Sequence, residues 1–324
     1  MEILVTGGAG FLGARLIAAL LAAQDAGAPG LPAFERIVSL DLAPCPVPDP
    51  RVTSRLGGVE EAEALAGAVG PQTRAVFHLA AVVSGQAEAE FETGMRVNLD
   101  GTRRLLDACR LRADRPLFFF ASSLAVFGAD CPAVVPDDQV LRPRSSYGTQ
   151  KAMGEMLVAD ASRRGFVEGI VGRLPTVVVR PGRPNAAASS FASSILREPM
   201  AGEPAVCPVD LDLPLWIGSP EATLRNIVAL ACLERARFGE RIEVNLPGIE
   251  TTPRAMLAAL TQACGPDAAS LVAHRPDPAI EAIVASWPSR FDTARAEALG
   301  LRGDPDVAAL VAAHQRAMGL TAWT

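Results

Sequence analysis

Short apolar runs alternate with longer segments of helical periodicity along the first half of the chain. The runs that predict strands are Glu2–Thr6, Arg36–Leu40, Ala75–Leu79, Leu117–Ala121 and Ile170–Val179. The segments whose apolar residues repeat with helical spacing are Phe11–Gln24, Met95–Ala113 and Tyr147–Arg163. Because strands and helices alternate, we expect βαβ units and a parallel sheet that is covered on both faces.

The second half has a less regular pattern. Arg180–Pro208 is rich in Pro, Ala and Ser, which predicts a loop with one short helix, Ser189–Arg197. A further helix is expected at Pro220–Phe238 and a strand at Ile242–Asn245, and short helices follow from Thr251. We therefore expect a core of residues 1–179, to which residues 220–246 return, and a smaller, mostly helical cap of residues 180–219 and 247–324.

The composition narrows the class of protein. Of the 324 residues, 49% are hydrophobic, which is enough to bury a large core, and we find no apolar run long enough to predict a membrane-spanning helix. A net charge of −6 argues against general nucleic-acid binding, which needs a basic surface. The six cysteines are scattered and form no cluster with the three histidines. Since no basic segment precedes the first apolar run, we expect a cytoplasmic protein without a disulfide framework, a metal site or a membrane partner.

Gly7, Gly10 and Gly13 lie between the first predicted strand and the first predicted helix. In such a loop one glycine allows a tight turn, one lets the backbone approach a pyrophosphate, and one lets helix and strand pack closely. The phosphate then faces free N–H groups at the positive end of the helix dipole. The position at a strand–helix junction favours a dinucleotide-binding loop over an ordinary turn.

Asp41 follows the second predicted strand. A carboxylate at this point can accept hydrogen bonds from both hydroxyls of an adenosine ribose, and it repels the 2′-phosphate of NADP. No arginine follows immediately to neutralise that phosphate. The sequence therefore predicts NAD rather than NADP, against the alternative of a solvated acid at the end of a strand.

A serine pair, a tyrosine and a lysine form the candidate chemistry. Ser122 and Ser123 follow a predicted strand, and Tyr147, the only tyrosine, precedes Lys151 by one helical turn, so that both lie on one helix face. A phenol has a pKa of about 10, which is too high for a base at neutral pH. We expect the Lys151 ammonium and an oxidised nicotinamide to lower this pKa as positive neighbours. Ser123 would then donate a hydrogen bond to the substrate oxygen.

These motifs resemble the extended short-chain dehydrogenase/reductases of the NAD-dependent epimerase/dehydratase family over nearly the whole chain. The further motifs that carry the resemblance are Phe77–Ala81, Val97–Thr102, Ser122–Gly128 and Arg173–Thr176. The resemblance implies a Rossmann-type doubly wound parallel sheet with a smaller, mostly helical substrate-binding cap. It also implies NAD as the cofactor and a homodimer formed through the helices Met95–Ala113 and Tyr147–Arg163. The chain departs from the family at Gly58-Val59, where an aspartate often holds the adenine.

The resemblance also implies roles for individual residues. The implied catalytic residues are Ser123, Tyr147 as the base, and Lys151. The implied cofactor contacts are Gly7, Gly10, Phe11, Leu12, Gly13, Asp41, Leu79, Ala80, Ala81, Asn98, Ser122, Tyr147, Lys151, Leu174 and Pro175. The candidate substrate contacts are Ser84, Gln86, Ser123, Tyr147, Arg183 and Asn185. Either Arg180 or Arg183 is a candidate partner for a carboxylate.

The segments Ala81–Glu88, Arg180–Phe191 and Phe291–Ala296 carry a closer resemblance. They are similar to the group of this family that oxidises C2 of the four-carbon sugar acid D-erythronate with NAD⁺, which implies the same reaction here. The small residues after Asn185 and an aromatic content of 5% favour a compact polar pocket. Two alternatives stay open: an NDP-sugar epimerase or dehydratase of the same family, and an NAD-binding regulator without turnover.

Overall fold

The computed structural model describes residues 1–128, 130–182 and 186–317. Its main sheet has seven parallel strands in the order β10-β6-β5-β4-β1-β2-β3. These strands are β1 (Glu2–Thr6), β2 (Arg36–Asp41), β3 (Val52–Leu56), β4 (Thr73–His78), β5 (Leu117–Ser123), β6 (Glu168–Leu174) and β10 (Glu243–Asn245). The chain runs outward from β1 to β3 and then crosses to β4 on the other side of β1, which makes this a doubly wound sheet with its switch point between β1 and β4.

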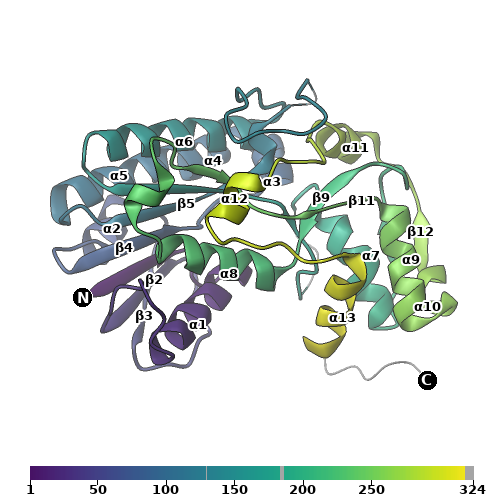
Figure 1. Ribbon diagram of the computed structural model, residues 1–324, viewed down its shortest axis with the longest axis horizontal. Helices are drawn as coiled ribbons and strands as arrows, with labels where there is room; N and C mark the ends of the chain where they lie inside the picture. The colour runs from purple at the N-terminus through teal and green to yellow at the C-terminus, as the bar shows by residue number, and fades with distance from the viewer. Residues whose placement is uncertain (129, 183–185, 318–324) are drawn as a thin grey trace.

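Helices cover both faces of the main sheet (Figure 1). One face carries α1 (Phe11–Asp25) and α8 (Pro220–Ala231), and the other carries α2 (Ala62–Ala68), α5 (Gly101–Arg112) and α6 (Ser146–Arg163). In β5, Phe119 packs into the apolar cluster of the first face, whereas Phe118 and Phe120 pack into that of the second. Both faces of the sheet are therefore buried, as expected for parallel strands.

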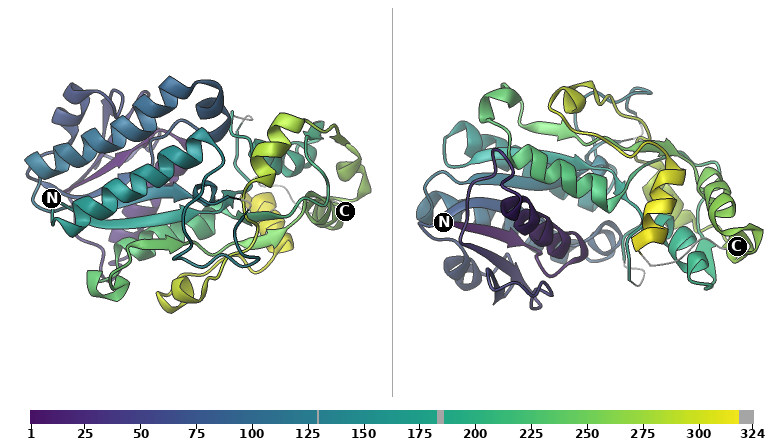
Figure 2. Two further views of the ribbon diagram at one scale, coloured as in Figure 1. Left: turned by 90° about the horizontal axis from the view of Figure 1, so that it is seen from above. Right: turned by 60° about the horizontal axis from the view of Figure 1, so that its bottom comes forward.

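A second group of elements lies on the other side of the molecule, away from β1, β2 and β3 (Figures 1 and 2). A three-stranded sheet joins β7 (Thr176–Val177), β9 (Leu215–Gly218) and β11 (Ile249–Thr251), and β8 (Ala205–Cys207) pairs with β12 (Val272–His274). The helices around them are α7 (Ser190–Met200), α9 (Pro253–Cys264), α10 (Pro266–Ser270), α11 (Pro278–Ala285) and α13 (Val307–Ala317). They enclose their own apolar cluster, which includes Phe191, Ile195 and Met256.

The remaining elements are short. They are α3 (Ser84–Ala89), α4 (Phe91–Gly94), the π-helical turn η1 (Met95–Asp100), the 3₁₀ turns η2 (Leu124–Val126) and η3 (Arg235–Phe238), and α12 (Ala294–Ala298). Leu299 and Leu301, which follow α12, pack into the apolar cluster beneath α1 and α8. The division of the chain into a core and a cap stays a prediction. Over the described ranges, no helix has both the length and the apolar character that crossing a membrane requires.

The structure differs from two predicted elements and adds strand β3, which the sequence pattern did not predict. The strand predicted at Ile170–Val179 is split, because β6 ends before Pro175, which has no N–H to donate, and Thr176–Val177 pair with β9 in the other sheet. The predicted helix Pro220–Phe238 ends at Ala231, and its last residues form η3. Strand β3 had no apolar signal because it lies at the sheet edge and most of its side chains are exposed.

Candidate active site

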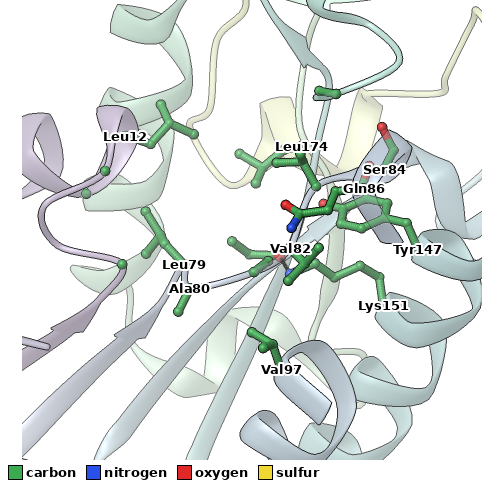
Figure 3. Close-up of a pocket in the computed structure, with 18 of the residues that line it drawn as sticks. Leu12, Leu79, Ala80, Val82, Ser84, Gln86, Val97, Tyr147, Lys151 and Leu174 are labelled. Atoms are coloured by element: carbon green, nitrogen blue, oxygen red, sulfur yellow. Dashed lines mark hydrogen bonds between the residues drawn. The ribbon is translucent and has the colours of Figure 1, made fainter. Parts of the chain in front are cut away.

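A cavity of about 640 Å³ opens at the carboxyl ends of the central strands. The glycine loop after β1, the segment after β4, Ser122 and Ser123 of β5, and the start of α6 line it. Figure 3 shows Tyr147 and Lys151 projecting from the same helix beside Ser84 and Gln86, whereas Leu12 and Leu79 lie on the opposite side. The cavity therefore follows the switch point of the sheet, where doubly wound proteins bind their ligands.

The glycine loop holds the start of α1 tightly against β1. Gly7 has a φ of +71°, which favours glycine, and a Cβ atom at Gly13 would lie 2.0 Å from the Gly7 carbonyl oxygen. Helix α1 begins at Phe11 without a side-chain cap, so its first N–H groups remain available at the positive end of the helix. These features fit a pyrophosphate group of NAD, which the backbone around Gly10, Phe11 and Leu12 would hold.

Asp41 lies at the rim of the cavity next to this loop. Its Oδ2 accepts a hydrogen bond from the Ala9 N–H at 2.9 Å and its Oδ1 accepts one from the Leu42 N–H at 2.6 Å. A carboxylate has about four acceptor positions, so acceptor capacity remains for the two hydroxyls of a ribose. The fixed position of Asp41 thus fits the predicted preference for NAD.

Asn98 is hydrogen-bonded to the backbone of the segment after β4, which lines the cavity. Its Oδ1 accepts from the Val82 N–H at 2.7 Å, and its Nδ2 donates to the Val82 carbonyl at 3.0 Å. The side chain is buried and is not among the residues that line the cavity, whereas Leu79, Ala80 and Ala81 are. A direct contact of Asn98 with NAD stays a prediction, and the structure gives it a role in fixing the segment after β4.

His78 connects β1, β4 and α5 in the interior. Its Nδ1 lies 2.7 Å from Thr6 Oγ1 and its Nε2 lies 2.9 Å from Thr102 Oγ1, which itself donates to the Asn98 carbonyl at 2.6 Å. Because the Thr102 hydroxyl has one hydrogen and uses it on Asn98, His78 Nε2 must be the donor and Nδ1 the acceptor. Burial, and then the charge of Lys151, lower the pKa of His78 to about 3. His78 is thus a packed residue of strand β4.

Ser123, Tyr147 and Lys151 meet at the carboxyl end of β5. The Tyr147 phenol and the Ser123 hydroxyl are hydrogen-bonded, and Ser123 Oγ also accepts from the Ala125 N–H at 3.1 Å. Lys151 Nζ donates to the Ala121 carbonyl at 2.9 Å and lies 5.7 Å from the centroid of the Tyr147 ring. The structure thus brings together the three residues that the sequence predicted as the catalytic set.

The charges around Tyr147 differ from the sequence-based expectation. Burial raises the pKa of Tyr147 to about 12, and the hydrogen bond to Ser123 and then the charge of Arg180 act in the opposite direction. The expectation that Lys151 lowers this pKa is therefore wrong, because the cation that acts on the phenol among the described residues is Arg180. Burial lowers the pKa of Lys151 itself to about 8, against the charge of Glu155.

Arg180 lines the same end of the cavity as Tyr147. Burial, and next the charge of Arg197, lower the pKa of Arg180. A desolvated guanidinium with another cation nearby favours a bound anion. Of the two arginines that the sequence offered for this role, Arg183 lies outside the described residues, as does Asn185.

Other residues at this end come from segments far apart in the chain. Gln86, Ser189 and Trp287 line the cavity, and Ser84 lines it while its hydroxyl accepts from the Ala188 N–H at 3.0 Å. Sequence reasoning missed Trp287, because the segment after α11 has no motif. Its side chain packs against two separate apolar clusters, a position that only the tertiary fold defines.

Known proteins resemble this chain over its full length. A family model described as the NAD dependent epimerase/dehydratase family matches residues 3–215. The chain is 48% identical over 322 residues to a D-erythronate dehydrogenase of Cupriavidus necator, covering 99% of both proteins. It is 42% identical over 306 residues to a D-erythronate dehydrogenase of Haemophilus influenzae, covering 94% of this chain and 95% of the relative. A nucleoside-diphosphate-sugar epimerase structure from Agrobacterium tumefaciens matches with a TM-score of 0.89 and 37% identity, covering 99% of this chain and 95% of that one.

Proposed function

The chain belongs to the NAD-dependent epimerase/dehydratase family, and from this premise we propose that it oxidises the C2 hydroxyl of D-erythronate to 2-dehydro-D-erythronate. It is an NAD-dependent dehydrogenase of CH–OH groups. NAD⁺, when bound, takes up the hydride that leaves C2 of the substrate. The residues that would hold it are the glycine loop and Asp41, whose backbone and carboxylate are arranged as described above.

The position of Arg180 beside Tyr147 is the observation that supports a 2-hydroxy acid as the substrate. In a 2-hydroxy acid, the carboxylate is bonded directly to the carbon that is oxidised, so its cation must lie next to the group that takes the hydroxyl proton. Arg180 meets this condition, because it lines the cavity and its charge acts on the Tyr147 phenol. Lys151 is engaged with the Ala121 carbonyl, and Arg96 lies 3.8 Å from Glu60 and is not among the charges that act on Tyr147. We therefore assign the substrate carboxylate to Arg180.

The side chains around Arg180 would accept the hydroxyl proton and bind the other hydroxyls of the substrate. The C2 hydroxyl gives its proton to the oxygen of Tyr147, while C2 loses a hydride and its bond to oxygen becomes a carbonyl. The hydrogen bond to Ser123 and the charge of Arg180 favour the ionised phenol that this step requires. Gln86 and Ser189 offer hydrogen bonds to the C3 and C4 hydroxyls from the same end of the cavity.

An absorbance assay tests this function. With purified protein and NAD⁺, D-erythronate should yield NADH stoichiometrically at 340 nm, and NADP⁺ should support a much lower rate. A panel of C4 and C5 aldonic acids, D-threonate included, defines the preferred acid. A nucleotide sugar that is converted without net change at 340 nm would instead identify the epimerase alternative, which the Agrobacterium tumefaciens relative keeps open. NAD⁺ binding with no turnover of any acid or nucleotide sugar would indicate a regulator.

We further propose that the protein acts in the cytoplasm as a homodimer that pairs α5 and α6 of both copies. Leu111 on α5 is 70% exposed and Met156 on α6 is 63% exposed, and the two helices pack side by side (Figure 2). These two exposed apolar side chains are available for contact with a second copy. Sedimentation velocity should give twice the mass of one chain, and Met156→Glu should give a single chain that keeps its fold.

A further inference from the structure

Lys151 is the only lysine of the chain, and it lies in the interior with 3% of its surface exposed. Its Nζ donates to the Ala121 carbonyl and lies 4.8 Å from the centroid of the Phe120 ring. Neither a carbonyl nor an aromatic ring supplies a full negative charge to compensate a buried ammonium. Glu155 lies one turn further along α6, is 2% exposed, and its negative charge raises the pKa of Lys151.

The carboxylate of Glu155 is shared between two neighbouring strands. Its Oε1 accepts from Ser122 Oγ and from Arg173 Nε at 3.0 Å, and its Oε2 accepts from Arg173 Nη2 at 2.8 Å. Ser122 and Arg173 are register partners on β5 and β6. Lys151 and Glu155 therefore hold two consecutive residues of β5, Ala121 and Ser122, immediately before Ser123.

We propose that Glu155 is a positioning residue, whose carboxylate clamps the end of β5 to α6 and compensates the buried charge of Lys151. The clamp fixes the distance between Ser123, which ends β5, and Tyr147, which lies in the first turn of α6 on the same face as Lys151. The inference rests on the proposed function only in treating these three residues as the catalytic set.

Two buried cations, Lys151 and Arg173, act on this carboxylate. The other described contacts of the Arg173 guanidinium carry no full charge: they are the Asp137 carbonyl at 2.8 Å, Asn245 Oδ1 at 3.4 Å and the Phe127 ring, whose centroid lies 4.9 Å from Cζ. The Asp137 carboxylate is itself paired with Arg295 at 3.2 Å. An arginine keeps its proton in proteins, whereas a lysine can give up its proton. Removal of the Glu155 charge should therefore change the protonation of Lys151 and not that of Arg173.

The groups that face Lys151 from the other elements do not replace this charge. His78 of β4 is a neutral imidazole that carries its proton on Nε2, and Tyr147 is a phenol whose pKa burial raises to about 12. Burial already lowers the pKa of Lys151 to about 8 while Glu155 opposes it. Without the carboxylate, the lysine should therefore lose its proton at a lower pH.

A single-site titration tests the proposal without substrate or NAD⁺. Protein grown with lysine that is ¹³C-labelled at the ε-carbon gives one lysine signal, whose chemical shift follows the protonation of Lys151. We expect a midpoint near pH 8. Glu155→Gln should lower this midpoint by about one pH unit or more, and Arg173→Met should raise it by about as much, because the carboxylate then serves Lys151 alone.

The proposal predicts that the two variants shift the lysine midpoint in opposite directions. A general loosening of the site would shift the midpoint in the same direction in both variants. Glu155→Asp should recover part of the shift, and Asp160→Asn, on the exposed side of α6 beside Arg163, should cause none. If Glu155→Gln does not fold, the rise of the lysine midpoint in Arg173→Met still tests whether the Glu155 carboxylate compensates the charge of Lys151.

A midpoint that stays unchanged in Arg173→Met, or falls in both variants, overturns the proposal. Opposite shifts in a protein that does not oxidise D-erythronate would refute the proposed function and leave the role of Glu155 standing.

Discussion

Replacing Tyr147 with Phe is expected to lower kcat for D-erythronate oxidation about 1000-fold, the middle of the range for loss of a general base. The phenylalanine ring fills the same buried space, so the substitution removes only the oxygen that contacts Ser123. His78 cannot replace it, because both of its ring nitrogens are engaged in the interior. The rate is measured as NADH formation at 340 nm under saturating substrates, and NAD⁺ affinity by calorimetry should change by less than about twofold.

The single tyrosine supplies an internal control for this variant. In the wild-type protein, absorbance at 295 nm should rise with alkaline pH at a midpoint near 12, and this rise should be missing in Tyr147→Phe. Ser123→Ala, which removes one hydrogen bond and leaves the phenol in place, should cause a smaller loss of about 10- to 100-fold. A Tyr147→Phe protein that keeps more than about a tenth of the wild-type kcat would exclude Tyr147 as the base.

Substitution of Arg180 by Met is expected to lower kcat/KM for D-erythronate about 100-fold or more, chiefly through KM. Methionine keeps much of the side-chain length but removes the charge, and loss of one partner of a buried charged pair costs affinity on this order. Because the charge of Arg180 also lowers the pKa of Tyr147, the pH at which activity appears should move upward in the variant. Initial rates over a range of acid concentrations at several pH values separate the two effects.

Arg96→Met is the matched control, because Arg96 also lines the cavity but lies beside Glu60. It should leave KM for the acid unchanged. Erythritol, which has four carbons and no carboxylate, should react equally poorly with the wild type and with Arg180→Met. If Arg180→Met binds D-erythronate as well as the wild type does, the assignment of the carboxylate site is incorrect.

The parts of the site that sequence reasoning predicted are those that depend on local order along the chain. The strand Glu2–Thr6 is confirmed at both ends, and α6 begins at Ser146, one residue before the predicted start. Since the carboxyl ends of parallel strands meet at one edge of a sheet, the glycine loop, the segment Leu79–Ala81 and Ser123 necessarily converge there. Their joint position in the cavity follows from the alternation of strands and helices.

The parts that could not be predicted depend on burial and on contacts between distant elements. A glutamate in the middle of a helix most often faces solvent, and only the packing of α6 on β5 and β6 makes Glu155 the partner of Arg173. The extent to which burial raises the pKa of Tyr147, and the opposing charge of Arg180, likewise depend on tertiary packing, and the effect of a bound nicotinamide stays a prediction. Arg180 reaches this phenol because β6 stops at Pro175 and the chain continues into the second sheet.

The burial of the sole lysine has a practical consequence for work on this protein. Common amine-directed cross-linkers and fluorophores react with lysines at the surface, and Lys151 is 3% exposed. The side chains of the folded protein should therefore resist such reagents, and mapping of its neighbours requires carboxyl-directed chemistry. For the same reason, one lysine introduced at a surface position becomes the one accessible lysine side chain for attaching a dye or a solid support.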